Sequence, residues 1–185
     1  MNKLATLSLP VILLLTACGG GGGGGGGVVG NGGNGGDSPQ TDSNVALASA
    51  GASASATYDN GNAGLVNDGD NSTSNFWAGN ITGDSVTIDF GSVKDITSIT
   101  VYTNSTTFNS TNPDKRIEIS EDGNTWSLTA QLTGGDLGCA SASMASGRIE
   151  CTLADRTDAR YIRFTTTATS NVGLIQVYEM EVQGR

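Results

Sequence analysis

An alternation of apolar and polar residues with a period of two constrains the fold of this chain more than any other feature. Val86, Ile88 and Phe90 alternate with Thr87 and Asp89. Similar short alternating segments lie between Gly, Asn and Asp residues, at 99–102, 117–120, 162–165 and 179–182. Because successive side chains of a strand point to opposite faces of a sheet, each segment predicts a strand with one buried face. Such a series of strands divided by turns predicts an all-β domain with the architecture of a β-sandwich.

The first residues lack this alternation and predict a targeting segment. Lys3 precedes a short apolar stretch, Leu7–Leu15, which falls short of the roughly 20 apolar residues that a membrane-spanning helix needs. The stretch ends in Leu15-Thr16-Ala17-Cys18, which resembles the lipobox of bacterial lipoprotein precursors. That resemblance implies a lipoprotein signal peptide over residues 1–17 that is cleaved before Cys18. The alternative is an ordinary cleaved signal that happens to contain a cysteine.

Residues 18–43 predict a lipid anchor followed by a linker. The lipobox resemblance implies that Cys18 carries a diacylglycerol, and several acyl chains anchor a protein stably. The next residue is Gly19, whereas the inner-membrane retention signal of enterobacterial lipoproteins is an Asp, so we expect an outer-membrane location. Nine consecutive glycines, 19–27, open a Gly-rich linker that we expect to be disordered, with a reach of roughly 25–30 Å. The folded domain is then expected to span residues 44–185.

The charge balance and the absence of histidine exclude several classes of function. A formal net charge of −9 repels a phosphate backbone, so nucleic acid is not expected as a partner. The same charge disfavours direct attraction to anionic lipid, so we expect membrane contact through the lipid anchor only. With no histidine in the chain, Ser-His-Asp and Cys-His catalytic arrangements and His-based zinc sites are excluded.

Three cysteines are present, Cys18, Cys139 and Cys151. If Cys18 carries the lipid, an even pair remains, and in an oxidising compartment the simplest expectation is a Cys139–Cys151 disulfide. Such a short loop would stabilise the fold by at most about 3 kcal/mol. The alternative is two unpaired thiols in a reducing compartment.

A series of short phrases occurs in order along the predicted domain. They are Asn44-Val45-Ala46-Leu47, Val66-Asn67-Asp68-Gly69-Asp70, Ile88-Asp89-Phe90-Gly91, Ile119-Ser120-Glu121-Asp122-Gly123-Asn124-Thr125-Trp126, Ala159-Arg160-Tyr161-Ile162-Arg163-Phe164 and Tyr178-Glu179-Met180-Glu181-Val182. Together they resemble the coagulation factor 5/8 type C, or discoidin, family of the galactose-binding-like superfamily, which includes family 32 carbohydrate-binding modules. The resemblance implies an eight-stranded jelly-roll β-sandwich whose first and last strands lie close together, with Trp126 at a core position.

The same resemblance implies a structural Ca²⁺ site. The loop that begins at Asp68 is rich in oxygen ligands, which suit Ca²⁺ at about 2.3–2.6 Å and suit zinc poorly. Its predicted ligands, carried over by position, are Leu65, Asp68, Asp70, Thr73, Tyr178 and Glu179. The alternative is an Asp-Gly turn and an exposed Glu with no metal.

Paired carboxylates also invite a glycosidase hypothesis, but Glu179 and Glu181 lie two residues apart on one predicted strand. A glycosidase needs its two carboxyl groups on opposite sides of a substrate cleft, about 5–10 Å apart. We therefore expect no enzymatic activity.

In carbohydrate-binding relatives, loops at one end of the sandwich provide an aromatic ring and polar partners for a sugar. The resemblance implies Phe108, Trp77 and Tyr58 as aromatic candidates, with Asn104 and Arg116 as polar candidates. Trp77 has a second interpretation, in which it packs beside the calcium loop. The missing histidine puts the family's usual galactose-type site in doubt.

The function expected from the sequence is a surface-anchored lipoprotein whose discoidin-like domain binds carbohydrate without catalysis and is stabilised by calcium. The alternative is a structural or adhesive module of the cell envelope that binds a protein and no sugar.

Overall fold

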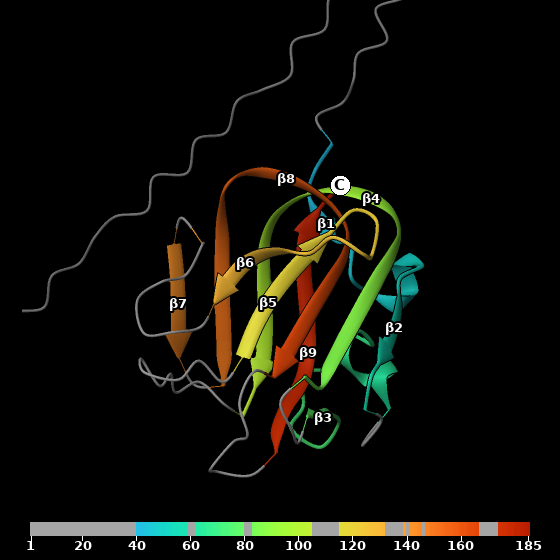
Figure 1. The fold of residues 1–185 in the computed structure, drawn as a ribbon, viewed down its shortest axis with the longest axis vertical. Helices are drawn as coiled ribbons and strands as arrows, with labels where there is room; N and C mark the ends of the chain where they lie inside the picture. The colour runs from blue at the N-terminus through green and yellow to red at the C-terminus, as the bar shows by residue number, and fades with distance from the viewer. Residues whose placement is uncertain are drawn as a thin grey trace, which may run out of the picture. The chain divides into compact units, whose positions relative to one another are not determined.

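Two long strands, β4 (Ser85–Thr103) and β8 (Arg148–Thr166), organise the fold in the computed structural model. Each of them bends, so that its two halves belong to different layers of the sandwich. The first part of β4 pairs with the last part of β8, with Ile88 opposite Ile162. The register shifts after Asp89, and the later part of β4 then pairs with the first part of β8. Both strands curve over the same end of the molecule (Figure 1).

The structure describes residues 40–58, 62–79, 83–104, 115–131, 139, 141–145, 147–166 and 174–185. Residues 37–185 form one compact unit. The other described elements are β1 (Ser43–Asn44), η1 (Ala48–Ala50), β2 (Ser53–Ala56), η2 (Ala63–Val66), β3 (Trp77–Gly79), β5 (Lys115–Ser120), β6 (Ser127–Gln131), β7 (Ser141–Ala145) and β9 (Ile175–Gly184). The predicted signal peptide, Cys18 and the glycine run lie outside the described residues.

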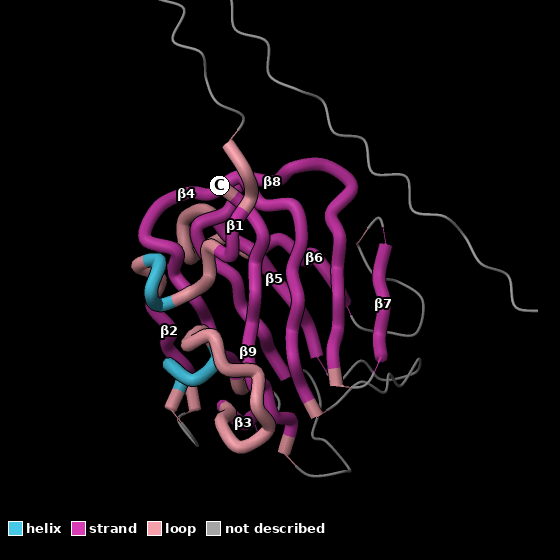
Figure 2. The backbone as a smooth tube through the Cα atoms, turned by 180° about the vertical axis from the view of Figure 1, so that it is seen from behind, coloured by secondary structure: helices cyan, strands magenta, loops and turns pink. Residues whose placement is uncertain are grey.

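The bends divide one continuous hydrogen-bonded sheet into two layers. The first layer has the order β2, β4, β8, β5, β6, and the second has the order β7, β8, β4, β9. Short strands β1 and β3 both lie along the free side of β9, and η2 lies beside β2 (Figure 2). All of these pairings are antiparallel. The pairing of β1 with β9 confirms that the first and last strands are neighbours.

The alternating residues of both layers form one core. Val86 and Ile88 of the first layer and Ile99 and Val101 of the second are all buried in the same cluster. This arrangement confirms the predicted all-β jelly-roll sandwich. The expected count was eight strands, whereas the described chain has nine strand segments, because β4 and β8 stay continuous through their bends and short strands are added at the edges.

The two ends of the domain meet at the bend end, which we define by Asp42, Val93, Arg156 and Arg185. The guanidinium of Arg156 donates to both carboxylate oxygens of Asp42, at 2.7 and 2.9 Å. Both Arg156 and Arg185 also pair with Asp95 on the bend of β4. These side chains are partly exposed, so each pair contributes little alone. Asp42, which precedes the expected start at residue 44, is nevertheless part of the fold.

The opposite end is the loop end, which we define by Tyr58, Asn104, Lys115 and Thr166. Here β4 and β8 each both begin and end, and β5 and β9 begin. The bend end and the loop end therefore lie at opposite ends of the sandwich (Figure 1). None of the helices in the described ranges has the length and apolar character that crossing a bilayer requires.

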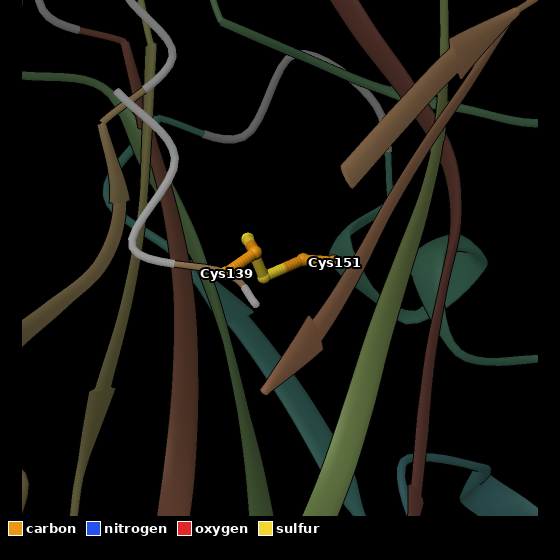
Figure 3. Close-up of a disulfide and its surroundings, with 2 residues drawn as sticks. All are labelled: Cys139 and Cys151. Atoms are coloured by element: carbon orange, nitrogen blue, oxygen red, sulfur yellow. A yellow bond between two sulfur atoms is a disulfide. The ribbon is translucent and has the colours of Figure 1, made fainter. Parts of the chain in front are cut away.

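Cys139 and Cys151 form a disulfide, as the cysteine count predicts (Figure 3). Cys151 lies on β8, where its side chain is buried in the core cluster, and Cys139 packs against that cluster. The bond therefore ties a segment between β6 and β7 to the second layer.

Replacing both cysteines with serine (Cys139→Ser, Cys151→Ser) should lower the free energy of unfolding by up to about 3 kcal/mol, because the unfolded chain is no longer constrained by the short loop. Equilibrium urea unfolding of residues 19–185 under non-reducing conditions measures this. A reductant should lower the midpoint of the wild-type chain and leave that of the variant unchanged. Superimposable curves for oxidised wild type and variant would contradict a stabilising role for the bond.

Candidate functional site

A buried carboxylate on the last strand is the most unusual polar group in the described structure. Glu179 on β9 is 1% exposed, and its Oε1 atom has no hydrogen-bond partner. Its other oxygen, Oε2, accepts a long hydrogen bond of 3.4 Å from the backbone N–H of Gly69. Buried charges are normally paired or coordinate a metal, so an unpartnered carboxylate oxygen calls for a ligand.

A local irregularity of β9 places this carboxylate. Tyr102 of β4 pairs with Glu179, but the next residue, Thr103, pairs with Val177, so Tyr178 is an extra residue in β9. Such a β-bulge changes the direction of neighbouring side chains. Inward-facing Val177 and Met180 thus flank two successive residues, Tyr178 and Glu179, that do not belong to the core cluster.

The surroundings of Glu179 make its ionised form less favourable than that of an exposed carboxyl. Burial is the main cause that raises the pKa of Glu179 to about 7; the Gly69 N–H works against this rise, and the negative charges of Asp68 and Glu181 add to it. A pKa shift of this size corresponds to about 3 kcal/mol of unfavourable interaction with the ionised carboxyl. A bound cation would remove much of that penalty, because it supplies the missing opposite charge.

The loop that covers Glu179 is held in place by its own hydrogen bonds. Asn67 is buried, and its side chain donates to the carbonyl of Ala46. The Asp68 carboxylate accepts a hydrogen bond from the Asp70 N–H, at 2.8 Å, which closes a tight turn. Gly69 has a φ of +90° in this turn, a conformation that favours glycine. The turn directs the Gly69 N–H toward Glu179.

The predicted calcium ligands come from two segments of the chain. Leu65 belongs to η2, Asp68 and Asp70 follow it, and Thr73 lies in the next exposed turn. Tyr178 and Glu179 come from the bulge of β9. The structure thus brings the two predicted segments together at Gly69 and Glu179.

The donor set around the turn suits a hard cation. It offers carboxylate and backbone carbonyl oxygens, which are the ligands of Ca²⁺ and Mg²⁺. No group of three or more His, Cys, Asp and Glu side chains suited to a metal occurs among the described residues. A cation here would therefore depend on the buried oxygen of Glu179 together with backbone carbonyls.

One aromatic candidate for sugar contact is wrong. Trp77 of β3 is completely buried, and its indole N–H donates to the carbonyl of Tyr58 at 2.7 Å. Its ring belongs to the hydrophobic core, where burial of a large aromatic surface is favourable, so no face is available to a ligand. Its second interpretation, packing beside the loop that follows η2, describes the structure better.

Tyr58 is the exposed aromatic side chain of the described loop end. Its side chain is 40% exposed, and Tyr58 lies two residues beyond the end of β2. The hydrogen bond from the Trp77 indole to the Tyr58 carbonyl fixes the backbone at this position. The Tyr58 ring is therefore exposed while its backbone is held in place. Phe108, the other aromatic candidate, lies outside the described residues.

The two polar candidates differ in what they offer to a ligand. The side-chain amide of Asn104 donates to the Leu174 carbonyl and accepts from the Gln176 N–H, so it joins the end of β4 to the start of β9. Both of its functional atoms already have protein partners. Arg116 at the start of β5 is exposed and has no ion pair within the described part of the chain. Only Arg116 presents an unengaged charged group.

Some features of this region give no recognisable signal in the sequence. The bulge at Tyr178 cannot be recognised in the sequence. It adds one residue to β9, and the alternation of apolar and polar residues continues on both sides of it. Lys115 is fully buried at the loop end, although it begins a strand beside exposed Arg116. Trp126 was expected in the core, but it lies outside the core cluster with the guanidinium of Arg163 3.9 Å from its ring.

A polar cleft of about 440 Å³ lies away from the loop end, next to the turn between β5 and β6. Hydroxyl and carboxylate side chains form most of its wall, including Glu121, Asp122 and Asp158. The backbone N–H groups of Thr125 and Asn124 lower the pKa of Asp122 to about 2, because they donate to its carboxylate. Asp122 therefore stabilises its own turn, and the cleft lacks a buried polar group without a partner.

Comparison with known proteins identifies the domain. The family model of the F5/8 type C domain matches residues 49–180. A search of curated protein sequences found no match. The module CpGH89CBM32-6 produced by Clostridium perfringens has a TM-score of 0.58 at 23% identity, and the match covers 77% of this chain and 100% of that one.

Two other solved structures were determined with sugars bound. The family 32 CBM from C. perfringens NanJ, in complex with galactose, has a TM-score of 0.53 at 17% identity, covering 77% of this chain and 98% of that one. Chitosan-binding module 2 from a chitosanase/glucanase of Paenibacillus sp. IK-5, in complex with chitotriose, has a TM-score of 0.54 at 18% identity, covering 75% and 98%. These likenesses show the fold, and the family model that matches residues 49–180 shows that the chain belongs to the F5/8 type C domain family.

Proposed function

We propose that this protein is a surface-anchored, non-catalytic carbohydrate-binding module. The observation that supports this most is the F5/8 type C fold, whose structural neighbours include carbohydrate-binding modules solved with galactose and with chitotriose. The exposed ring of Tyr58 at the loop end supports a sugar site there, because sugars present apolar faces that stack on aromatic rings.

The positions of the two ends of the domain agree with surface presentation. The described chain enters at the bend end through Asp42, which Arg156 holds. Tyr58 lies at the opposite end of the sandwich. A linker that joins the bend end to a lipid anchor therefore leaves the loop end free to face away from the membrane.

Glycan binding can be tested through the exposed tyrosine. Affinity electrophoresis of residues 19–185 on a panel of soluble polysaccharides should show retardation by at least one of them, and Tyr58→Ala should weaken it about tenfold or more, because stacking contacts are lost. Val93→Ala, which removes an exposed apolar side chain at the bend end, is the matched control and should bind like wild type. No retardation by any polysaccharide, with capture of an envelope protein instead, would favour the alternative of a protein-binding adhesive module.

We also propose that a Ca²⁺ ion stabilises the domain between the loop and the last strand. Glu179 and Asp68 would supply carboxylate oxygens, and Leu65, Asp70, Thr73 and Tyr178 would supply the remaining oxygens, mostly from the backbone. The bound ion would neutralise the buried carboxylate and join an early loop to the final strand. The unpartnered Oε1 atom of Glu179 supports this proposal.

Calcium at 100 times its dissociation constant should raise the free energy of unfolding by about 2.7 kcal/mol, and excess EGTA should remove this gain. Thermal unfolding at pH 7.5 measures the effect. Glu179→Gln should abolish the calcium response. Glu181→Gln removes a charge two residues away on the same strand, so it is the matched control and should keep the response. A wild-type melting curve unchanged between calcium and EGTA would exclude the site.

We propose finally that the mature chain is anchored in the outer membrane through lipid on Cys18. The lipobox-like Leu15-Thr16-Ala17-Cys18 and the following Gly19 support this proposal. In a Gram-negative host expressing the full chain, metabolic labelling with a radioactive fatty acid should label the wild-type protein and not Cys18→Ser. Wild-type label should fractionate with the outer membrane, and an unlabelled wild-type protein released as a soluble form would rule out lipidation.

A further inference from the structure

We infer that this domain is built to resist mechanical force applied between the chain before Asp42 and the loop end. The inference rests on the proposed surface anchoring in one respect, because a module tethered at the bend end is pulled along this axis when a ligand bound at the loop end moves away. It follows from the direction of the first and last strands and from a group of side chains at the bend end. We call this group the terminal clasp and define it by Asp42, Asp95, Thr97 and Arg156 together with Arg185.

The first strand enters the domain at the bend end and runs beside the last strand. β1 and β9 are antiparallel, with Ser43 opposite Gly184. The contact continues beyond β1, because the Val45 N–H donates to the Val182 carbonyl at 2.9 Å, and the Val182 N–H donates to the side-chain oxygen of Asn44 at 3.0 Å. Hydrogen bonds of an antiparallel pair lie perpendicular to the strands. A pull along β1 toward the bend end is therefore resisted by all of these bonds at once, in shear.

The same pair of strands is weaker against a pull in another direction. The chain before Ser43 and the end of β9 both lie at the bend end of the domain (Figure 2). A pull between these two ends separates β1 from β9 one residue pair at a time, beginning with Ser43 and Gly184. The arrangement therefore predicts a resistance that depends on the direction of the force.

The terminal clasp holds the chain immediately before β1. The Asp42 carboxylate accepts hydrogen bonds from the Arg156 guanidinium, at 2.7 and 2.9 Å, and from the Thr97 hydroxyl, at 3.0 Å. The same hydroxyl lies 3.2 Å from the Gln183 carbonyl, which it can also reach as a donor. Arg156 lies on the bend of β8, and Thr97 lies on the bend of β4. Asp42 is therefore connected to both long strands before the chain enters β1.

The clasp also fastens the end of β9, so that the last strand does not slide when β1 is pulled. The backbones of Arg185 and Asp95 exchange two hydrogen bonds, at 3.1 and 3.2 Å, and the Arg185 guanidinium donates to the Asp95 carboxylate at 3.1 Å. Arg156 donates to the same carboxylate at 3.3 Å. Gly184 lies so close to β4 that a Cβ atom there would come within 2.9 Å of the Asp95 carbonyl oxygen. The end of β9 is thus held against the bend of β4.

The position of the clasp gives it an importance under force that it lacks at equilibrium. Single exposed ion pairs contribute little to stability, whereas a network with two hydrogen bonds between one Arg and one carboxylate keeps its members in a fixed arrangement. Resistance to force is governed by the rate of unfolding rather than by the free energy of unfolding. Because Asp42 precedes Ser43, a pull on the chain reaches the clasp before it reaches the β1–β9 bonds. If the clasp only prevented fraying of the ends, resistance would not depend on direction.

Pulling in two geometries tests the directional part of the inference. Residues 19–185 with the disulfide intact would be stretched in calcium by single-molecule force spectroscopy, first between the N-terminus and a 4-azidophenylalanine replacing exposed Arg116 at the loop end. The second geometry would use the N-terminus and a tag after Arg185. At equal loading rate, the first geometry should require at least about twice the rupture force of the second, because shear breaks the bonds together.

A matched pair of variants tests the clasp. Asp42→Ala removes the carboxylate that Arg156 and Thr97 hold, and it should shorten the lifetime of the fold under constant force in the first geometry by about fivefold or more, with little change in the midpoint of urea unfolding. Asp155→Ala removes an exposed carboxylate on the bend of β8 that is not part of the clasp, so it should keep the wild-type lifetime. Circular dichroism would verify that both variants are folded.

The outcomes separate this inference from the function on which it rests. Equal rupture forces in the two geometries, or an Asp42→Ala lifetime equal to that of the wild type, would overturn the inference while leaving lipid anchoring and carbohydrate binding intact. Absence of lipid on Cys18 would instead overturn the proposed anchoring, and the directional rupture forces would still be measured on the isolated domain.

Discussion

The contact between the buried carboxylate of Glu179 and the Gly69 amide joins the last strand of the domain to an early loop. Glu179 lies where the last strand meets the loop after η2, and a long hydrogen bond from the Gly69 amide reaches its carboxylate. Burial and two neighbouring carboxylates make its ionised form unfavourable. A group of this kind is tolerated when a cation completes it, and the same cation would then hold the two segments together.

The bent strands explain how such distant segments come to meet. Because β4 and β8 each cross from one layer to the other, every strand that pairs with them is fixed in position by long antiparallel ladders. Strand β9 is thereby held next to β4, and its bulge at Tyr178 points Glu179 toward the loop after η2. The same bends place Asp42 and Arg185, near the two ends of the domain, at one end of the sandwich, and Tyr58 and Asn104 at the other.

Much of this fold follows from local pattern. The alternation at Val86 and Ile88 predicts both the strand and its buried face, since a shift of one residue would expose the whole apolar row. The number of cysteines predicts the Cys139–Cys151 disulfide, because these two remain if Cys18 carries the lipid. Trp77 was harder to place, because an aromatic residue in a polar stretch has the same appearance whether it stacks on a sugar or fills the core. Its burial depends on the pairing of β3 with β9, in which Trp77 lies opposite Val177, far away in the sequence.

The candidate site could be predicted only as a set of residue types. Asp68 and Glu179 were identified through a family resemblance, and neither the bulge that aims Glu179 nor the unpartnered oxygen could be read from spacing. The engagement of Asn104 between β4 and β9 was likewise hidden, because an Asn in a turn-rich stretch has many possible partners. Side-chain partnerships of this kind are set by tertiary packing, which no local pattern encodes.

The most direct test of the central claim is the hydrogen-exchange rate of the Gly69 amide in the folded domain, with saturating calcium and with EGTA. If a cation completes the Glu179 site and closes the loop on β9, calcium should slow exchange at Gly69 by up to about a hundredfold, while amides at the bend end keep their rates. Identical exchange at Gly69 in calcium and in EGTA would contradict the claim.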